Sequence, residues 1–400
     1  MGKTYRGLTR IGNTFSYEKE KEKPKPKGEF FVKVFDYDGT LLDEVWLNKD
    51  ETYTLPTPPT HERLDFTAWT TTTAAVNNVI TITNNDVMVG ATYTPKSGMS
   101  EFDIELTPAI APDIESDGYT VTLNMTGSKY WDYGNDKTTS DTEITHTYYA
   151  YGKYTIACDG TMSGISNGNG IVGQGGTKIN YFLQRAFMGA ASSLLSYAFQ
   201  YCYGLENITL AKTFTASYFL RDCRSLKALV FPPSQNQVPL YFCNNCYSLK
   251  TLILSSKISS SAYVGSNAFG NCPINPLVLP EFASISSSNF IGNRVVEKVT
   301  ILGNISNSNN FSDNYSLREV KLYKSQFRFS CFYNCYSLKI IDMTNRTSVP
   351  STQDSTLPTW AQKNLKIVVP DELYDDWIVA TNWTGLHALG VIYKASEVEL

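Results

Sequence analysis

The sequence predicts a mainly β protein of several modules, the largest of which is a solenoid of stacked strands. The unit F-x-x-C/N-x-x-L-x-x-I-x-L recurs seven times between residues 199 and 343. The stretch before it alternates short apolar runs with turn residues. The composition agrees, because 26 Tyr and 20 Phe with only 18% charged residues favour strands and turns over helical bundles.

Charge and hydropathy restrict the function classes. The net charge of −4 argues against nucleic acid as a partner, and three His leave few options for His-based catalysis or zinc. No apolar run reaches 18 residues, so we expect no membrane insertion. The first sixteen residues lack the apolar core of a signal peptide. We therefore expect a chain that is not addressed to secretion, and Met1 favours exit from the cell by another route over a missing processed leader.

The N-terminal region is expected to be an anchor followed by a spacer. Residues 17–28 read YEKEKEKPKPKG, in which alternating charges are solvated and the prolines favour an extended chain. This linker would hold residues 1–16, the anchor segment, away from the rest of the chain.

Residues 29–105 are expected to form a small β-module. Phe30–Phe35 and Leu41–Leu47 read as two strands with a turn at Asp38-Gly39 between them. The segments DETYTLPTPP (50–59) and LDFTAW (64–69) come next along the chain. These segments resemble the Listeria–Bacteroides repeat, and the resemblance implies a β-grasp-like module of surface proteins.

The residues of the first turn of this module also match a catalytic motif. Asp36-Tyr37-Asp38-Gly39-Thr40 resembles the D-x-D-G-T motif of haloacid-dehalogenase-like phosphatases, in which the first Asp is the nucleophile. That chemistry needs an α/β scaffold and further catalytic residues downstream of the motif. The sequence supplies turn residues typical of β-hairpins instead. We expect a hairpin with Gly39 at the turn and no Mg²⁺ there; the phosphatase remains a third hypothesis.

Residues 106–160 are expected to form a β-sandwich. Trp131-Asp132-Tyr133-Gly134, His146-Thr147-Tyr148 and Gly152-x-Tyr154-x-Ile156 carry the pattern of a core Trp, a tight turn and a returning strand. These motifs resemble the PKD repeat, an immunoglobulin-like fold. The acidic residues Asp132, Asp136 and Asp141 are interpreted as turn carboxylates in preference to a metal site. Residues 161–176, rich in Gly, Ser and Asn, are expected to be a linker.

The repeats span residues 177–392 and resemble BspA-type (Treponema-type) leucine-rich repeats. The resemblance implies one short parallel strand per coil, with inward Leu and Ile. The fourth residue of each unit is expected to turn the chain and satisfy buried backbone groups as a ladder: Cys202, Cys223, Cys246, Cys272, Asn293, Asn314 and Cys335. LKIVVP (365–370) reads as the last strand, DELYDDWIVATNW (371–383) as one amphipathic capping helix, and residues 393–400 as a tail.

The cysteine pairs Cys243/Cys246 and Cys331/Cys335 have two interpretations. Close spacing is typical of metal or redox pairs, but the repeat already explains Cys246 and Cys335 as ladder residues. We expect buried free thiols that behave as small apolar side chains, with no metal and no cofactor.

Two surface features of the solenoid are candidates for binding. The residue after each ladder position forms one row, which holds Tyr203, Arg224, Tyr247, Pro273, Arg294, Tyr315 and Tyr336. Rows of Tyr and Arg are common in binding surfaces, although a Tyr at this position is equally explained as a turn residue of the repeat. The outward strand positions Val230, Ile253 and Val278 would form an exposed apolar strip that contacts another chain or domain.

The sequence thus predicts a non-catalytic structural or adhesion protein. The leading hypothesis is a bacteriophage virion component, a fibre or appendage, whose N-terminal segment binds other virion proteins and whose solenoid binds a host surface protein or glycan. The second is a bacterial cell-surface adhesin. Homo-oligomerisation is left open, and the expected location is the virion surface or, in the alternative, the bacterial cell surface.

Overall fold

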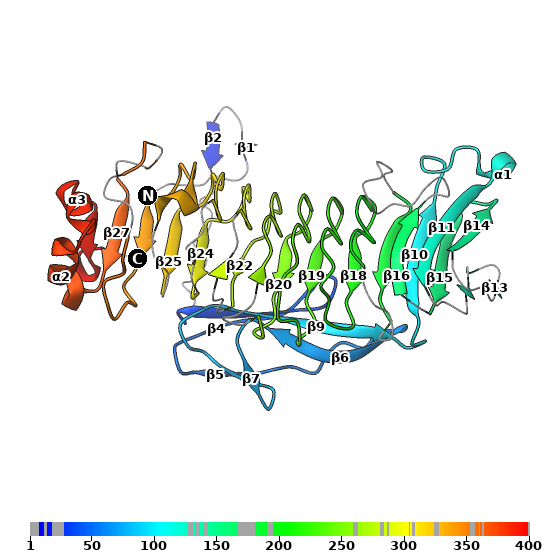
Figure 1. The fold of residues 1–400 in the computed structure, drawn as a ribbon, viewed down its shortest axis with the longest axis horizontal. Coiled ribbons are helices and arrows are strands. Elements are labelled where there is room, and N and C mark those ends of the chain that lie inside the picture. Colours follow the sequence, from blue (N-terminus) through cyan, green and yellow to red (C-terminus); the bar gives the residue numbers. More distant parts are fainter. Residues whose placement is uncertain are drawn as a thin grey trace.

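A computed structural model describes residues 8–11, 14–17, 28–126, 131–132, 134, 137–138, 143–159, 161–166, 181–189, 195–258, 263–280, 284–285, 288–303, 305, 309–323, 328–352, 357–359, 361 and 364–398. The described chain is mainly β, which confirms the predicted fold class. A long parallel solenoid forms its body (Figure 1). A sheet-rich unit lies at one end, short helices lie at the other, and a smaller β-module packs along its side (Figure 1).

The N-terminal segment contains one described hairpin. Strands β1 (Leu8–Ile11) and β2 (Thr14–Tyr17) pair in antiparallel fashion. Most of the expected spacer, 17–28, lies outside the described residues. The anchoring role of residues 1–16 stays a prediction.

The N-terminal module consists of two sheets. The larger has the order β4-β3-β9-β6 and places the first strand parallel to the last. Its strands are β3 (Phe30–Phe35), β4 (Leu41–Leu47), β6 (Leu64–Thr71) and β9 (Val87–Pro95). The smaller sheet holds β5 (Thr52–Thr54), β7 (Ala75–Val76) and β8 (Val79–Thr81). Val32, Val34, Ile80 and Val89 are buried between the two sheets.

The predicted hairpin of this module is confirmed. Strands β3 and β4 have the expected bounds and pair in antiparallel fashion. The Gly39 N–H donates to the Asp36 carbonyl at 3.1 Å, and Gly39 has φ +88°, a conformation that only glycine adopts freely.

The region predicted to be a sandwich joins the solenoid directly. A six-stranded sheet has the order β13-β12-β15-β10-β17-β18, and a three-stranded sheet has the order β14-β11-β16. The strands are β10 (Ser100–Leu106), β11 (Tyr119–Thr126), β12 (Trp131–Asp132), β13 (Lys137–Thr138), β14 (Glu143–Tyr148), β15 (Gly152–Cys158), β16 (Thr161–Ser166) and β17 (Leu183–Phe187). The short helix α1 (Ile114–Asp117) connects β10 to β11.

These pairings differ from the expected boundaries. Strand β10 pairs with β15 and β17, so residues 100–105 belong to the sandwich and not to the preceding module. Residues 161–166 of the expected linker form β16 and pair with β11, while 167–176 lie outside the described residues. The turn residues Asp136 and Asp141 also lie outside them. One sheet runs from the sandwich into the first coil, because β17 pairs with β10 on one side and with β18 on the other.

The solenoid stacks one short strand per coil. Its strands are β18 (Asn207–Thr209), β19 (Ala228–Val230), β20 (Thr251–Ile253), β22 (Leu277–Val278), β24 (Lys298–Ile301), β25 (Glu319–Leu322) and β26 (Ile340–Asp342). Strand β19 pairs in parallel with β20, and β22, β24, β25 and β26 pair in parallel in that order. Two short strands, β21 (Tyr263–Val264) and β23 (Ser284–Ile285), pair apart from this sheet, and a 3-10 turn spans Phe329–Phe332.

The C-terminal end differs from expectation in two ways. Strand β27 (Lys366–Val369) is followed by β28 (Ile392–Lys394), which extends the parallel sheet into the expected tail. The expected single helix is two helices, α2 (Tyr374–Val379) and α3 (Trp383–Ala388); one 3-10 turn at Asp371–Leu373 precedes α2, and another at Ala395–Glu397 follows β28. The break lies at Asn382, whose left-handed φ of +68° a continuous helix cannot contain. It lets Trp377 and Trp383 both bury at the end of the core, with ring centroids 5.2 Å apart.

Candidate functional site

Each coil passes through left-handed backbone one residue before its ladder residue, and the first six coils also do so at an earlier position. The earlier position lies five residues before the ladder residue: Tyr197, Tyr218, Tyr241, Asn267, Ser288 and Asn309. The later position lies one residue before it: Tyr201, Asp222, Asn245, Asn271, Gly292, Asp313 and Asn334. Non-glycine residues with positive φ are uncommon, and Asn and Asp are enriched among them. Sequence reasoning missed these positions, although Asn, Asp or Gly before almost every ladder residue was a usable signal.

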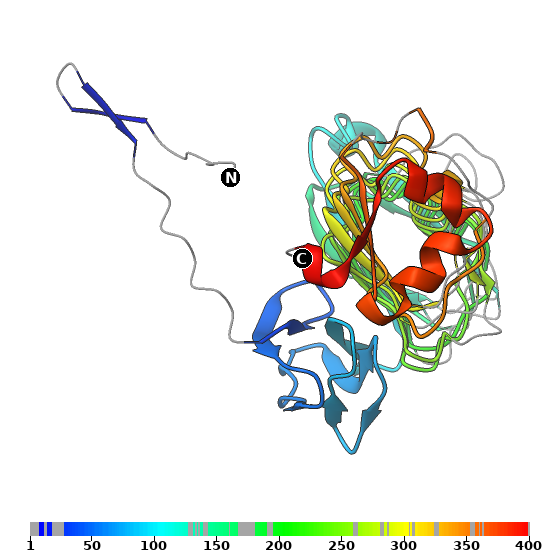
Figure 2. The same ribbon diagram turned by 90° about the vertical axis from the view of Figure 1, so that its left-hand side faces the viewer.

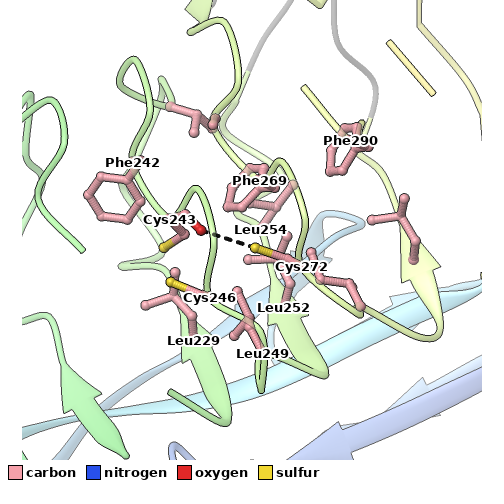
Figure 3. Close-up of a cluster of buried hydrophobic side chains, with 14 of the residues drawn as sticks. Leu229, Phe242, Cys243, Cys246, Leu249, Leu252, Leu254, Phe269, Cys272 and Phe290 are labelled. Carbon is pink, nitrogen blue, oxygen red and sulfur yellow. Dashed lines mark hydrogen bonds between the residues drawn. The ribbon is translucent and has the colours of Figure 1, made fainter. Parts of the chain in front are cut away.

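The ladder residues lie inside the coils and donate hydrogen bonds to the preceding coil. The Cys223 Sγ donates to the Phe199 carbonyl at 3.1 Å, and the Cys272 Sγ to the Cys243 carbonyl at 3.0 Å (Figure 3). The Asn314 Nδ2 donates to the Phe290 and Phe311 carbonyls at 3.0 and 2.7 Å. The ladder thus satisfies carbonyl groups that the core would otherwise leave unpaired.

The cysteines are buried thiols and not a reactive site. All eight are buried and none forms a disulfide. Burial raises the pKa of the Cys243 thiol to about 11 and that of Cys335 to about 12, so both stay protonated near neutral pH. Phe242, Phe269 and Leu252 lie around Cys243, Cys246 and Cys272 (Figure 3). Among the described residues, no group of three or more His, Cys, Asp or Glu side chains could hold a metal ion.

The row after the ladder is a line of Tyr and Arg side chains in contact along the solenoid, here called the aromatic–arginine row. The Arg224 guanidinium carbon lies 4.0 Å from the Tyr203 ring centroid and 5.7 Å from that of Tyr247. The Tyr315 and Tyr336 rings stack 5.9 Å apart. Tyr203 is buried beneath Arg224, whereas Tyr247, Tyr315 and Tyr336 are 40–51% exposed.

Farther along the same row, Arg294 lies on the next tyrosine. Its guanidinium carbon is 5.6 Å from the Tyr315 ring centroid. The row therefore offers flat rings and cationic donors to solvent in most coils, and Pro273 interrupts it in the fourth.

A second row lies directly beside it, on the other side of the ladder. This amide row consists of the left-handed residues that precede the ladder. The Asn245 Nδ2 donates to Asp222 Oδ1 at 3.1 Å, and the Asn271 Nδ2 donates to Asn245 Oδ1 at 2.8 Å. The Asn334 Nδ2 donates to Asp313 Oδ1 at 2.9 Å. These bonds fix the side chains in line, with Asn271 exposed, Asn245, Asp313 and Asn334 half-buried and Asp222 buried.

A third row consists of stacked tyrosines at the other left-handed position. The Tyr218 ring stacks on those of Tyr197 and Tyr241, with centroids 4.9 and 5.0 Å apart. The Arg221 guanidinium carbon lies 5.8 Å from the Tyr218 and Tyr241 centroids. Sequence reasoning missed this row as well, because these tyrosines lie outside the repeat consensus that it used.

The apolar strip is not exposed, contrary to expectation. Val230, Ile253 and Val278 are buried against Phe31, Phe35 and Met88 of the N-terminal module. The expected contact with another domain is thus one within the chain. Along the solenoid axis, the module lies outside the coils and to one side of them (Figure 2).

The contact between module and solenoid is close and hydrogen-bonded. A Cβ at Gly90 of β9 would lie 2.6 Å from Ile253 Cδ1 and 2.7 Å from Val230 Cγ1, so only glycine fits there without a shift. The Thr70 hydroxyl donates to the Phe231 carbonyl at 2.5 Å, and the Tyr323 hydroxyl donates to the Asn84 carbonyl at 2.6 Å.

The D-x-D-G-T turn serves this module structurally. Asp36 is buried, and its Oδ2 lies 3.0 Å from His61 Nε2. The Asp38 Oδ1 accepts the Thr40 N–H at 2.9 Å. Residues 28–113, all described, contain no helix, so the α/β scaffold of the resembled phosphatases is missing around this strand. The turn forms one wall of a hollow of about 600 Å³ against solenoid residues that include Tyr247.

Comparison with protein families identifies the repeats. Residues 186–263 and 255–354 match the BspA type leucine rich repeat region, in six copies. A comparison with curated proteins finds no match. Within the described residues, none of the helices has the length and apolar character needed to cross a membrane.

Two solved structures share a distant likeness. A leucine-rich repeat protein from Bacteroides ovatus ATCC 8483 is 15% identical, with 47% of this chain and 73% of that chain covered and a TM-score of 0.28. A leucine rich cell surface protein from Faecalibacterium prausnitzii A2-165 is 16% identical, with 53% and 73% covered and a TM-score of 0.28. Scores this low support no functional comparison. Over residues 186–354, less than half of the chain, the solenoid is similar to BspA type leucine rich repeats.

Proposed function

We propose that the chain is a non-catalytic adhesion protein that binds a glycan along the edge of its solenoid. The observation that carries this proposal is the aromatic–arginine row beside the hydrogen-bonded amide row. Tyrosine rings offer apolar faces to the C–H faces of sugar rings at low entropic cost, while amides, carboxylates and guanidinium groups exchange hydrogen bonds with hydroxyls. Both kinds of group recur in most coils, as an extended ligand requires.

The non-catalytic role is supported by the burial of the side chains that could otherwise act in catalysis. The Asp36 carboxylate is buried against His61, and the thiols of ladder cysteines such as Cys223 are buried hydrogen-bond donors in the repeat core. The six BspA type repeats favour a structural or adhesive protein over an enzyme.

The carrier of the protein is part of the proposal. Residues 29–105 and 106–160 would be a Listeria–Bacteroides-like and a PKD-like display module, and residues 1–16 would attach them to other structural proteins of a bacteriophage particle. The bacterial cell surface is the alternative carrier. Mass spectrometry of purified particles and of cell-surface fractions separates the two; absence from particles rules out the virion placement.

Binding is tested with the full chain on immobilised bacterial and host polysaccharides. Tyr247→Ala and Tyr336→Ala remove exposed rings from the aromatic–arginine row, and we expect each to weaken binding about tenfold, as for a buried aromatic anchor. The control is Tyr333→Ala, a 51% exposed tyrosine of the same solenoid outside the row. Equal binding by all three variants and the wild type would contradict the proposed site.

A further inference from the structure

Both surface rows lose a side chain at the same place. In the aromatic–arginine row, Pro273 stands where most other coils have Tyr or Arg. In the amide row, Gly292 stands one coil later where the neighbouring coils have Asn271 and Asp313. The two gaps adjoin, because Pro273 and Gly292 line one hollow.

The hollow is bounded by side chains of both rows. It has a volume of about 320 Å³ and is lined by Tyr247, Asn271, Pro273, Gly292 and Arg294. A second hollow of about 490 Å³ also includes Asn271, Gly292 and Arg294 and extends to Asp313 and Tyr315. We name the two together the coil-four notch. A Cβ at Gly292 would overlap the Asn271 Oδ1, so the shape of the notch depends on this glycine.

The polar atoms of the notch are only partly used by the protein. The Asn271 Nδ2 donates to Asn245 Oδ1 at 2.8 Å, which leaves the Asn271 Oδ1 as an acceptor at the Gly292 position. The Asp313 Oδ1 accepts from Asn334 Nδ2 at 2.9 Å and lies 3.4 Å from the Tyr315 hydroxyl, which leaves Oδ2.

A hydrogen-bond donor and two apolar surfaces complete the lining of the notch. Arg294 is exposed and supplies guanidinium N–H groups above the Tyr315 ring. The Tyr247 ring, 51% exposed, and Pro273 supply apolar surface. The notch therefore presents acceptors, a donor and a flat ring around one hollow.

We propose that the coil-four notch binds one pyranose unit of a neutral glycan, which makes it the specific subsite of the adhesion surface. Hydroxyl groups of the sugar donate to Asn271 Oδ1 and Asp313 Oδ2 and accept from Arg294, while the ring packs on Tyr247. A neutral ligand fits because Arg294 and Asp313 balance each other, so an acidic sugar gains one ion pair but faces one carboxylate. This inference rests on the proposed glycan-binding function and gives its location and ligand class.

The test fills the notch with asparagine, the residue that other coils carry at the position of Gly292. Gly292→Asn restores the amide row, and Asn tolerates the φ of +72° at this position, as Asn245 and Asn271 do. The control is Gly390→Asn, which has φ +69° and no atom within 4 Å of an added Cβ. Calorimetric titration uses neutral glucose- and galactose-containing oligosaccharides, with a sialylated oligosaccharide as the acidic comparison.

We expect a Kd raised about tenfold or more in Gly292→Asn and unchanged in Gly390→Asn. Arg294→Ala, an exposed change that does not depend on the backbone at Gly292, should weaken binding similarly. Wild-type affinity in both Gly292→Asn and Arg294→Ala overturns the notch, as does preference for the sialylated ligand. If Tyr336→Ala still weakens binding in that case, the adhesion surface stands without the notch; if wild type binds no saccharide, both fail.

Discussion

The guanidinium carbon of Arg224 lies 4.0 Å from the ring centroid of Tyr203, which belongs to the preceding coil. The same group lies 5.7 Å from the Tyr247 centroid in the following coil. One exposed arginine thus spans three coils and covers a tyrosine that is only 9% exposed. We propose that Arg224 contributes both to solenoid stability and to the proposed binding surface, and the two contributions can be measured separately.

Replacing Arg224 should affect binding more than stability. Arg224→Ala removes an exposed cation–π contact of about 0.5–1 kcal/mol, so the melting temperature should change little. Glycan affinity should fall several-fold, because the row loses a donor. Thermal denaturation and calorimetric titration measure the two effects, with Arg318→Ala, an exposed arginine ion-paired to Glu297, as the control. A large loss of stability with intact binding would contradict the assignment of Arg224 to the binding surface.

Gly90 should control the docking of the N-terminal module. Gly90→Val inserts methyl groups against Val230 and Ile253 and costs about 1–3 kcal/mol by overpacking. We expect the module to separate from the solenoid, which would expose the apolar strip, raise binding of a hydrophobic dye and increase the radius of gyration in solution scattering. Thr81→Val, at an exposed strand position of the module, is the control.

A second substitution strengthens the same prediction. Val230→Ala in the Gly90→Val background removes two of the atoms closest to the new side chain, so docking should partly return. An unchanged radius of gyration in Gly90→Val itself would show that the interface yields without separating.

The eight cysteines should be unreactive in the folded protein. Burial raises the pKa of the Cys223, Cys246 and Cys272 thiols well above the ordinary value, and only the thiolate reacts with a disulfide reagent. We expect no rapid thiol reaction near pH 8 and reaction of all eight thiols in concentrated guanidinium chloride. Rapid reaction of any cysteine in the native protein would show that its coil opens.

The stability of the module contact should fall as the pH rises through the range of Asp86. Burial raises the pKa of Asp86 to about 6, although the Phe31 N–H and nearby lysines act in the opposite direction. Between about pH 4 and 6 the folded chain therefore binds more protons than the unfolded chain, so the free energy of unfolding decreases with pH. The resulting decrease in the free energy of unfolding, at most about 3 kcal/mol, is complete above pH 6 and absent below about pH 4.

Asp86→Asn tests this titration directly. The amide oxygen can still accept the Phe31 N–H, which lies 3.0 Å from the Asp86 Oδ1, and it carries no charge. The variant should melt higher than the wild type at neutral pH and at the same temperature near pH 4. Asp65→Asn, an exposed change in β6, should show no such difference. A constant difference between Asp86→Asn and wild type across this pH range would contradict the prediction.

The repeat made the inside of the solenoid predictable. A residue such as Cys246 or Leu252 meets nearly the same neighbours in each coil, so seven copies of one pattern report one environment seven times. The hairpin at Asp38-Gly39 was predictable for a different reason, since its turn depends on adjacent residues only. The Asn, Asp and Gly residues of the amide row can be read from the sequence. Their alignment was not predicted, because it depends on the left-handed backbone before each ladder residue, which the repeat pattern does not specify.

The sequence by itself determined the coil, its ladder and its strand, because these depend on contacts between residues one repeat apart. Only the tertiary structure decided which surfaces stay open. Gly90 meets Val230 across 140 residues, and β10 meets β17 across more than 70, so these pairings depend on the shape of surfaces that no local pattern encodes. They bury the apolar strip under the N-terminal module. The coil-four notch was decided there too, because Pro273 and Gly292 form one hollow only when successive coils stack.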